Sequence, residues 1–331
     1  MIIIRTPLRI SLFGGGTDYP VWYKKFGGSV ISTSINRYNY ITSRWLPQFF
    51  DYKYRIRYFL KEEVSNIDDI KHPSVKACAN FLKIKDGFEV VHYSDLPAQS
   101  GLGSSSSFTV GMLHSFYSLQ SKTPTKRELA TNAIYVEQNV IKECVGSQDQ
   151  IVAAFGGFNK IDFDISNNFE VTPIVISKSR LKQLEENLLL CFTGLQRSAS
   201  EIAELQVQNT ISKEKELKKI KDITERAFEV ITSENKSIDD VGLLLKEHWE
   251  LKSSLTNKIS SNFIDSIYSK GISNGAIGGK LLGAGGGGFM LFYAHKENHD
   301  KIKHALKEFI FVPISFEFSG SKVVYFSRSH E

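Results

Sequence analysis

Cysteine is scarce in this chain of 331 residues, which contains only 3 of them. Cys78, Cys144 and Cys191 lie far apart in the sequence, each among apolar neighbours. This spacing excludes a disulfide framework and a zinc cluster, because both need several cysteines at defined spacings. We therefore expect buried, reduced thiols in a cytoplasmic protein.

Long apolar runs and a large excess of one charge are also absent. No apolar run reaches membrane-spanning length, and residues 1–5 are too short, with the charge on the wrong side, for a secretory signal. The net charge of +5 arises from 41 basic and 36 acidic residues whose signs are interleaved. No basic stripe with interleaved aromatic residues occurs. We therefore expect neither a nucleic-acid nor a membrane partner, while the mild positive charge suits small anions.

The composition is that of a globular protein, with 41% hydrophobic and 23% charged residues, and the length suffices for two domains. Strand-like groups alternate with blocks of helix, which predicts an α+β fold divided near residue 175 into domains 1–175 and 176–331. Strands are expected at 7–13, 29–46, 53–60, 159–164, 171–176, 188–192, 276–282 and 289–294, with a β-pair over 312–327. Helices are expected at 73–83, 104–119, 125–142, 181–187 and 299–309, with a long helical region over 199–255.

The most informative segment is residues 97–107, which read PAQSGLGSSSS. They lie between a β-like run at 88–93 and an apolar, helix-compatible run that begins at Phe108. Glycines allow the backbone to approach a ligand closely, and the free N–H groups at a helix start attract anions. Serine hydroxyls can donate to phosphate oxygens or bind Mg²⁺. The segment predicts a phosphate-binding loop; the alternative is a serine cap after a linker-like turn.

A second glycine cluster, Gly14–Gly16, follows a strand on which Arg9 and Ser11 share one face. Three glycines leave space for a ligand, and Thr17 and Asp18 offer polar groups at its rim. The alternative is a tight turn in which Asp18 caps a helix.

A third cluster spans residues 278–288 and contains the pattern GxGxxG. A dinucleotide fingerprint needs a helix after this pattern, but residues 289–293 are strand-like. Lys280 is not a P-loop lysine either, because Asn274 and Leu281 occupy positions where that motif needs glycine and Ser or Thr. The cluster therefore predicts a glycine-rich loop between two strands, able to lie against a phosphate or a sugar.

Two carboxylates, Glu137 and Asp149, flank a break at Gly146. Phosphoryl transfer from Mg·ATP needs one carboxylate on the metal and another that accepts the proton of the attacking hydroxyl. The alternative is that both are solvated helix residues.

Residues 193–198 contain Gly, Thr, Ser and Arg197 before a helix, which is typical of an anion site; a plain capped loop is the alternative.

The three glycine clusters and the carboxylate spacing together resemble the GHMP kinases, the family of galactokinase, homoserine kinase, mevalonate kinase and phosphomevalonate kinase. The resemblance spans nearly the whole chain, with residues 5–19, 97–107 and 280–288 similar to the first, second and third family motifs. It implies two domains: an N-terminal mixed α/β ATP-binding domain and a C-terminal ferredoxin-like α+β domain. It also implies that ATP and Mg²⁺ are used.

The resemblance further implies roles for individual residues. Asp149 and Arg9 would be the catalytic residues, with Asp149 taking the proton of the hydroxyl and Arg9 stabilising the charge that develops on the transferred phosphoryl group. Ser105 and Glu137 would hold Mg²⁺. The residues implied to bind ATP are Ser100, Gly101, Leu102, Gly103, Ser104, Ser105, Ser106 and Ser107. The residues expected to bind the acceptor, partly from the resemblance and partly from the glycine clusters and the 193–198 segment, are Gly14, Gly15, Gly16, Thr17, Asp18, Arg197, Gly285 and Gly286.

Within the family, the stretches at 14–18, 100–111 and 146–150 are most similar to bacterial D-glycero-D-manno-heptose 7-phosphate kinases. This similarity implies transfer of the γ-phosphoryl group of ATP to the anomeric hydroxyl of a small phosphorylated sugar, giving heptose 1,7-bisphosphate. Galactokinases carry Glu-His where this chain has Gly15 and Gly16. Three points stay open: a kinase of a free sugar of the fucose or galactose type, a non-catalytic sugar sensor on the same fold, and a homodimer.

Overall fold

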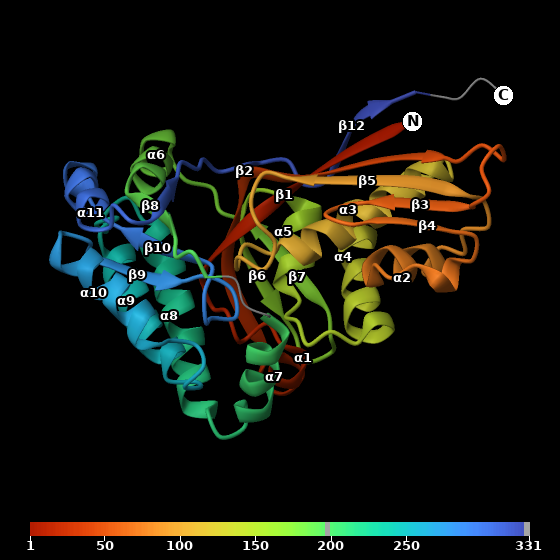
Figure 1. The fold of residues 1–331 in the computed structure, drawn as a ribbon. Helices are drawn as coiled ribbons and strands as arrows, with labels where there is room; N and C mark the ends of the chain where they lie inside the picture. The colour runs from red at the N-terminus through yellow and green to blue at the C-terminus, as the bar shows by residue number, and fades with distance from the viewer. Residues whose placement is uncertain (196–198, 328–331) are drawn as a thin grey trace.

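The computed structural model describes residues 1–195 and 199–327, which form an α+β structure with two sheets (Figure 1). The strands of the larger sheet are β1 (Ile2–Phe13), β2 (Gly28–Trp45), β3 (Tyr54–Arg57), β4 (Lys61–Val64), β5 (Phe88–Ser94), β6 (Phe158–Phe163), β7 (Phe169–Pro173) and β12 (Lys322–Phe326). The strands of the smaller sheet are β8 (Leu188–Phe192), β9 (Gly278–Leu281), β10 (Phe289–Tyr293) and β11 (Ile310–Val312). The α+β prediction is confirmed.

The helices lie in two groups. The first half of the chain contains α1 (Pro20–Phe26), the short η1 (Ile67–Asp69), α2 (Pro73–Phe81), α3 (Ser104–Leu119), α4 (Lys126–Tyr135), the π-helix η2 (Val136–Ile141) and α5 (Gln148–Phe155). The second half contains α6 (Lys178–Glu186), α7 (Ala199–Asn209), α8 (Glu214–Thr232), α9 (Asp240–Ser253), α10 (Asn262–Ser273), the short η3 (Lys296–Asn298) and α11 (His299–Ala305).

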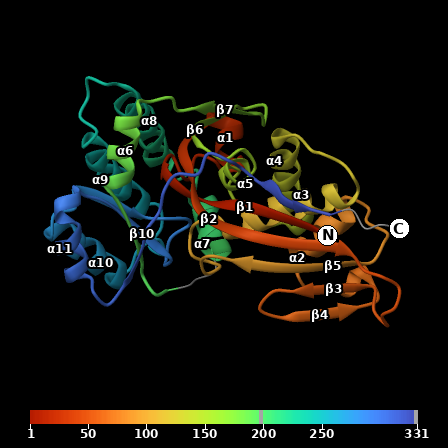
Figure 2. The same ribbon diagram turned by 90° about the horizontal axis from the view of Figure 1, so that it is seen from above.

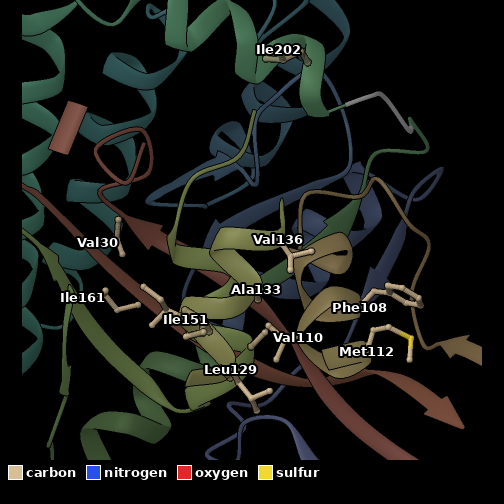
Figure 3. Packing of buried hydrophobic residues seen from close by; sticks show 14 of the residues in the cluster. Val30, Phe108, Val110, Met112, Leu129, Ala133, Val136, Ile151, Ile161 and Ile202 are labelled. Carbon is tan, nitrogen blue, oxygen red and sulfur yellow. The ribbon is translucent and has the colours of Figure 1, made fainter. Parts of the chain in front are cut away.

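The larger sheet has the order β12-β1-β2-β5-β3-β4, with β6 paired to β2 and β7 paired to β6. Helices α3 and α5 pack against it through buried apolar side chains, and α4 packs on α3 and α5 (Figure 3). Val110 of α3, Ala133 of α4 and Ile151 of α5 are fully buried in the same cluster as Val30 of β2 and Ile161 of β6. This packing fixes the starts of α3 and α5 relative to β1.

The smaller sheet is antiparallel, in the order β11-β8-β10-β9, and α9 contacts β9 and β10. The helical region expected at 199–255 is divided into α7, α8 and α9 by turns. Helix α10 was not expected, because it presents a short buried stripe of only Ile264, Ile267 and Gly271.

The β-pair expected over 312–327 is wrong. β11 pairs with β8 in the smaller sheet, whereas β12 pairs antiparallel with β1, with Ile2 opposite Phe326 and Arg5 opposite Lys322. In Figures 1 and 2, β12 lies beside the start of the chain, on the far side from the smaller sheet. The expected division at residue 175 falls between β7 and α6, but residues 322–326 return across it.

Two other expectations differ locally. The strand expected at 53–60 is a hairpin of β3 and β4, because the backbone N–H of Tyr58 donates to the carbonyl of Leu60 and turns the chain. The helix expected at 125–142 is α-helical only to Tyr135 and continues as η2. A π-helix is rare and often occurs at functional sites.

The cysteines are unpaired as expected, but Cys144 is only half-buried, whereas Cys78 and Cys191 are buried. Across residues 1–195 and 199–327, no helix combines the length and apolar character needed to cross a bilayer.

Candidate active site

A cavity formed by segments from both halves of the chain collects most of the predicted site residues. The predicted residues in its wall are Arg9, Gly15, Gly16, Asp18, Ser100, Gly101, Gly103, Ser104, Ser105, Ser106 and Asp149. Ser105 and Asp149, which the sequence places 44 residues apart (149 − 105), thus face one space.

The start of α3 forms one wall of the cavity. Gly103, just before the helix, has a left-handed backbone with φ of 71°, and Gly101 has φ of 81°. A Cβ atom on Gly101 would lie 2.5 Å from the carbonyl oxygen of Leu282, and one on Gly103 would lie 3.3 Å from Oδ2 of Asp149. Glycine is therefore required here by both conformation and space. The first N–H groups of α3 have no partner within the helix, so the wall is suited to bind an anion.

Asp149 is held by Arg9 at the first turn of α5. Nε and Nη2 of Arg9 each donate to one carboxylate oxygen of Asp149 at 2.7 Å, and Nη1 donates to the carbonyl oxygen of Gly101 at 2.6 Å. Arg9 is buried, and its backbone N–H donates to the carbonyl of Leu102. A bidentate pair of this kind fixes the plane of the carboxylate. The carboxylate of Asp149 is thus oriented beside the start of α3.

Asp18 and Gln148 form the polar end of the cavity. Oδ1 of Asp18 accepts the backbone N–H of Gly16 at 2.9 Å, and Oδ2 accepts Nε2 of Gln148 at 3.0 Å. Burial raises the pKa of Asp18 and the nearby charge of Asp149 raises it further, whereas the hydrogen bonds from Gly16 and Gln148 lower it. A buried carboxylate beside a second carboxylate favours a ligand that donates hydrogen bonds to it.

Two buried oxygens near this end have no hydrogen-bond partner among the described residues, Oγ of Ser11 and Oε1 of Gln148. A Cβ on Gly15 would lie 3.5 Å from Oγ of Ser11 and 3.7 Å from Nε2 of Gln148. The absence of a side chain on Gly15 therefore leaves the space beside these two groups open. Unpaired buried polar atoms are costly, and a ligand with several hydroxyl groups would pair them.

Glu137 of η2 lies behind the wall of the cavity and is fully buried. Its Oε2 accepts hydrogen bonds from Oγ of Ser106 at 2.8 Å and from Nε2 of Gln150, and its Oε1 has no partner among the described residues. Ser105, which the resemblance pairs with Glu137 as a ligand of Mg²⁺, is not the serine that donates to this carboxylate. Successive helical residues point about 100° apart, so Ser106 turns inward to Glu137 while the exposed Ser105 lies in the cavity wall.

The donor set around Glu137 fits Mg²⁺. A buried carboxylate oxygen without a partner needs a proton or a cation, and hydroxyl and carboxylate oxygens are hard ligands of the kind this ion prefers. Across the described ranges, no cluster of three or more His, Cys, Asp or Glu side chains could form a metal site by itself. Mg²⁺ usually needs few protein ligands, because phosphate oxygens and water complete its shell. Ser105, Ser106 and Glu137 are the residues that would hold it.

In Mg²⁺-free buffer, we expect the free energy of unfolding to fall as the pH rises through about 7, and Glu137→Gln to remove this dependence. Burial raises the pKa of Glu137 from its ordinary value of 4.5 to about 7. The protonated Glu137 carboxyl therefore makes its full contribution to the free energy of unfolding below pH 4.5, and this contribution is lost as the pH passes about 7. The size of the pKa shift limits the loss of unfolding free energy to about 3 kcal/mol.

Urea unfolding of the two proteins between about pH 5 and about pH 8 measures this difference. Added Mg²⁺ should stabilise the wild type more at the upper end of this range, because protons compete with the metal for the carboxylate. Identical profiles for the wild type and Glu137→Gln would contradict the assignment.

Ser105→Ala and Ser106→Ala should have opposite signatures. Ser106→Ala removes a donor from the buried Glu137 and should lower the free energy of unfolding by about 1–3 kcal/mol. Ser105→Ala changes an exposed side chain and should alter stability by no more than about 0.5 kcal/mol, while raising the Mg²⁺ concentration needed for half-maximal turnover. Unfolding curves and Mg²⁺ titrations of both variants test this pair. Equal changes in unfolding free energy and in Mg²⁺ requirement would show that the hydroxyls of Ser105 and Ser106 do not have the separate roles assigned to them.

Several predicted site residues lie in the framework of the loops instead of the cavity wall. Leu102 is a core residue, and the hydroxyl of Ser107 donates to the carbonyl of Thr6. The N–H of Gly14 donates to His248, and the hydroxyl of Thr17 donates to the carbonyls of Gly14 and Ser29. Gly285 and Gly286 pack on the segment at Ile259, to which Gly286 donates its N–H. Arg197 lies outside the described residues.

Lys252 of α9 lines the same cavity and was missed by sequence reasoning. The buried residues of α9 include Val241, Leu245, His248 and Lys252, spaced by three or four positions. A histidine and a lysine on an otherwise apolar helix stripe are unusual. That pattern is the signal that could have identified Lys252.

Comparison with known proteins places these features in a family. Residues 73–157 match the family model described as GHMP kinases N terminal domain, and residues 220–310 match that described as GHMP kinases C terminal. The chain is 31% identical over 316 residues to the D-glycero-alpha-D-manno-heptose 7-phosphate kinase of Campylobacter jejuni, with 92% of each chain covered. It is 26% identical to the galactokinase of Pyrococcus furiosus, covering 93% of this chain and 94% of that one.

Solved structures share the fold. A D-glycero-D-manno-heptose 1-phosphate kinase from Bacteriodes thetaiotaomicron superposes with a TM-score of 0.75 at 24% identity, covering 99% of this chain and 100% of that one. A galactokinase from Lactococcus lactis, solved with galactose, has a TM-score of 0.75 at 17% identity, with 97% and 94% covered. At these identities the likeness concerns the fold.

Proposed function

Because the chain belongs to the GHMP kinase family, we propose that it transfers the γ-phosphoryl group of ATP to the anomeric hydroxyl of D-glycero-D-manno-heptose 7-phosphate, giving heptose 1,7-bisphosphate. The chain is a GHMP-type sugar kinase, and therefore a phosphotransferase with an alcohol group as acceptor. The heptose phosphate and the anomeric position are the proposed parts.

One observation carries the proposed chemistry: Asp149, oriented by Arg9, faces the start of α3 across a single cavity. The phosphates of ATP bind along residues 101–106. Asp149 accepts the proton of the acceptor hydroxyl, whose oxygen forms a bond to the γ-phosphorus as the bond to the β-phosphate oxygen breaks. Mg²⁺, when bound, neutralises charge on the phosphates.

The polar end of the cavity supports a sugar as the acceptor. Asp18 offers a carboxylate to sugar hydroxyls, and the unpaired oxygens of Ser11 and Gln148 offer further partners. The relative from Campylobacter jejuni, which is named for heptose 7-phosphate, supports the choice of a phosphorylated heptose.

A free sugar is the second candidate acceptor. The galactokinase of Pyrococcus furiosus and a bifunctional fucokinase of Arabidopsis thaliana, 23% identical over 92% of this chain, support it. The groups around Asp18 recognise hydroxyls whether or not the sugar carries a distal phosphate. A non-catalytic sensor is disfavoured, because the residues needed for catalysis, Asp149, Ser105 and Glu137, are all present and Arg9 orients the carboxylate of Asp149.

A screen of ATP consumption decides between these acceptors. The purified protein is tested with D-glycero-D-manno-heptose 7-phosphate, the corresponding 1-phosphate, galactose and fucose, and the product is identified by phosphorus NMR. We expect the highest kcat/KM with the 7-phosphate and a new phosphate on the anomeric carbon. A preference for a free sugar or the 1-phosphate, or transfer to another carbon, would overturn the proposed substrate.

A further inference from the structure

Lys252 is a buried cation in the wall of the active-site cavity. It lies near the end of α9, is 4% exposed, and donates from Nζ to the carbonyl oxygen of Gly283 at 2.5 Å. A Cβ on Gly283 would lie 2.5 Å from the Cα of Gly101, so this contact ties Lys252 to the third glycine loop where that loop meets the phosphate-binding wall. An ammonium has three donors, and among the described residues only one of them is used.

Arg9, by contrast, is largely committed. Of the five N–H donors of a guanidinium, two are directed at the carboxylate of Asp149 and a third at the carbonyl of Gly101. These contacts hold the base and the loop in place before any ligand binds. Arg9 therefore has little capacity left for a phosphoryl group that gains negative charge during transfer.

The charges around Lys252 keep it suited to an anion. Burial, and after it the charge of Arg9, lower the pKa of Lys252 to about 8, although the charges of Asp18 and Asp149 act in the opposite direction. The ammonium is therefore mostly charged at neutral pH.

Two other basic side chains lie near Lys252 and belong to the framework. Nζ of Lys280 on β9 donates to the carbonyl of Leu12, and Nε2 of His248 accepts the N–H of Gly14. Burial lowers the pKa of His248 well below its ordinary value, as do the charges of Lys280 and Lys252, so this imidazole is neutral. Within the described part of the chain, Lys252 is the lysine in the cavity wall.

We propose that Lys252 is a catalytic residue that binds the phosphoryl group while it is transferred, and that Arg9 is the positioning residue of Asp149. The assignment rests on the proposed function, because it presupposes ATP-dependent transfer at this cavity. Negative charge spreads over the three equatorial oxygens of the phosphoryl group in the transition state, and a fixed cation there accelerates the reaction. Lys252 keeps its protons throughout, since the proton of the hydroxyl goes to Asp149.

The test uses a transition-state mimic and needs no sugar. Thermal unfolding is measured with Mg²⁺ and ADP, with and without aluminium fluoride, which occupies the place of the transferred phosphoryl group. We expect aluminium fluoride to raise the melting temperature of the wild type beyond the effect of ADP and Mg²⁺ alone. Lys252→Met should keep the effect of ADP and lose the additional increment, and Lys252→Arg should recover part of it. Lys246→Met, an exposed lysine of the same helix, is the matched control.

Turnover gives the second readout. Lys252→Met should lower kcat by about 10²–10³-fold with the KM for ATP nearly unchanged, as expected for a contact made in the transition state. If Met at this position prevents folding, Lys252→Gln is measured instead.

Several results would overturn the assignment of Lys252: a wild type without a fluoride increment, a full increment in Lys252→Met, or a rise only in the KM of the acceptor. If the wild type shows the increment, Lys252→Met loses it and no heptose phosphate is phosphorylated, the role of Lys252 stands and the proposed substrate fails.

Discussion

Asp149→Asn should lower the turnover number by about 10²–10⁴-fold, the usual contribution of a general base, and leave the affinity for ATP close to that of the wild type. The asparagine keeps the size of the side chain and can still accept one hydrogen bond from Arg9, but it cannot accept the proton of the hydroxyl. The wall proposed to bind the phosphates is formed by Gly101 and residues 103–106, so we expect ATP binding not to depend on the charge of Asp149. Steady-state kinetics and equilibrium titration with ATP separate the two effects.

Asp86→Asn is the matched control, because Asp86 is an exposed carboxylate remote from the cavity. Its turnover should equal that of the wild type. Circular dichroism at the assay temperature shows whether Asp149→Asn is folded. An unchanged turnover in folded Asp149→Asn would remove Asp149 from the catalytic role.

Arg9→Met should affect both activity and stability. Removal of the guanidinium leaves the carboxylate of Asp149 without its bidentate partner and the carbonyl of Gly101 without a donor. Breaking a buried ion pair from one side costs about 3–5 kcal/mol, and a loosely held base should lower kcat by about 10²-fold. Arg9→Lys should recover little, since an ammonium cannot bind the carboxylate with two parallel hydrogen bonds.

The double variant Arg9→Met, Asp149→Asn tests whether the two side chains act together. If Arg9 works by orienting Asp149, the second substitution should cost much less than it does in the wild type, in both turnover and free energy of unfolding. Urea unfolding and steady-state kinetics of all four proteins complete the cycle. Strictly additive losses would mean that Arg9 acts on the phosphoryl group independently, which would also weaken the role assigned to Lys252.

The parts of the site that could be predicted from sequence are those encoded locally. Helix α3 was expected at 104–119, because Gly103 ends the preceding turn and an apolar run follows the serines, and the helix has these bounds. Arg9 and Ser11 were expected on one strand face, and both line the cavity. In each case a short motif fixes the backbone and therefore the direction of the side chains.

The rest depends on contacts between segments far apart in the chain. Which of the four serines meets Glu137 is decided by the rotation of α3 against η2, and sequence spacing does not specify it. Lys252 reaches the cavity only because α9 packs on β9 beside the third glycine loop. The pairing of β11 with β8 and of β12 with β1 could not be predicted from the sequence. Two consecutive strands near a chain end favour a hairpin with each other, and only the fold shows that each meets an open edge of a different sheet.

That open edge has a consequence for how the protein is made. At its start, residues 2–5, the strand that also bears Arg9 is paired with β2 on one side and with residues 322–326 on the other, and these follow all the other described elements in chain order. Until they are made, the nascent chain exposes a row of unpaired backbone groups, the kind of edge that recruits chaperones or sticks to a neighbouring copy. We therefore expect the first half, expressed alone to residue 175, to associate more readily than the whole chain, because residues 2–5 would lack the partner strand β12.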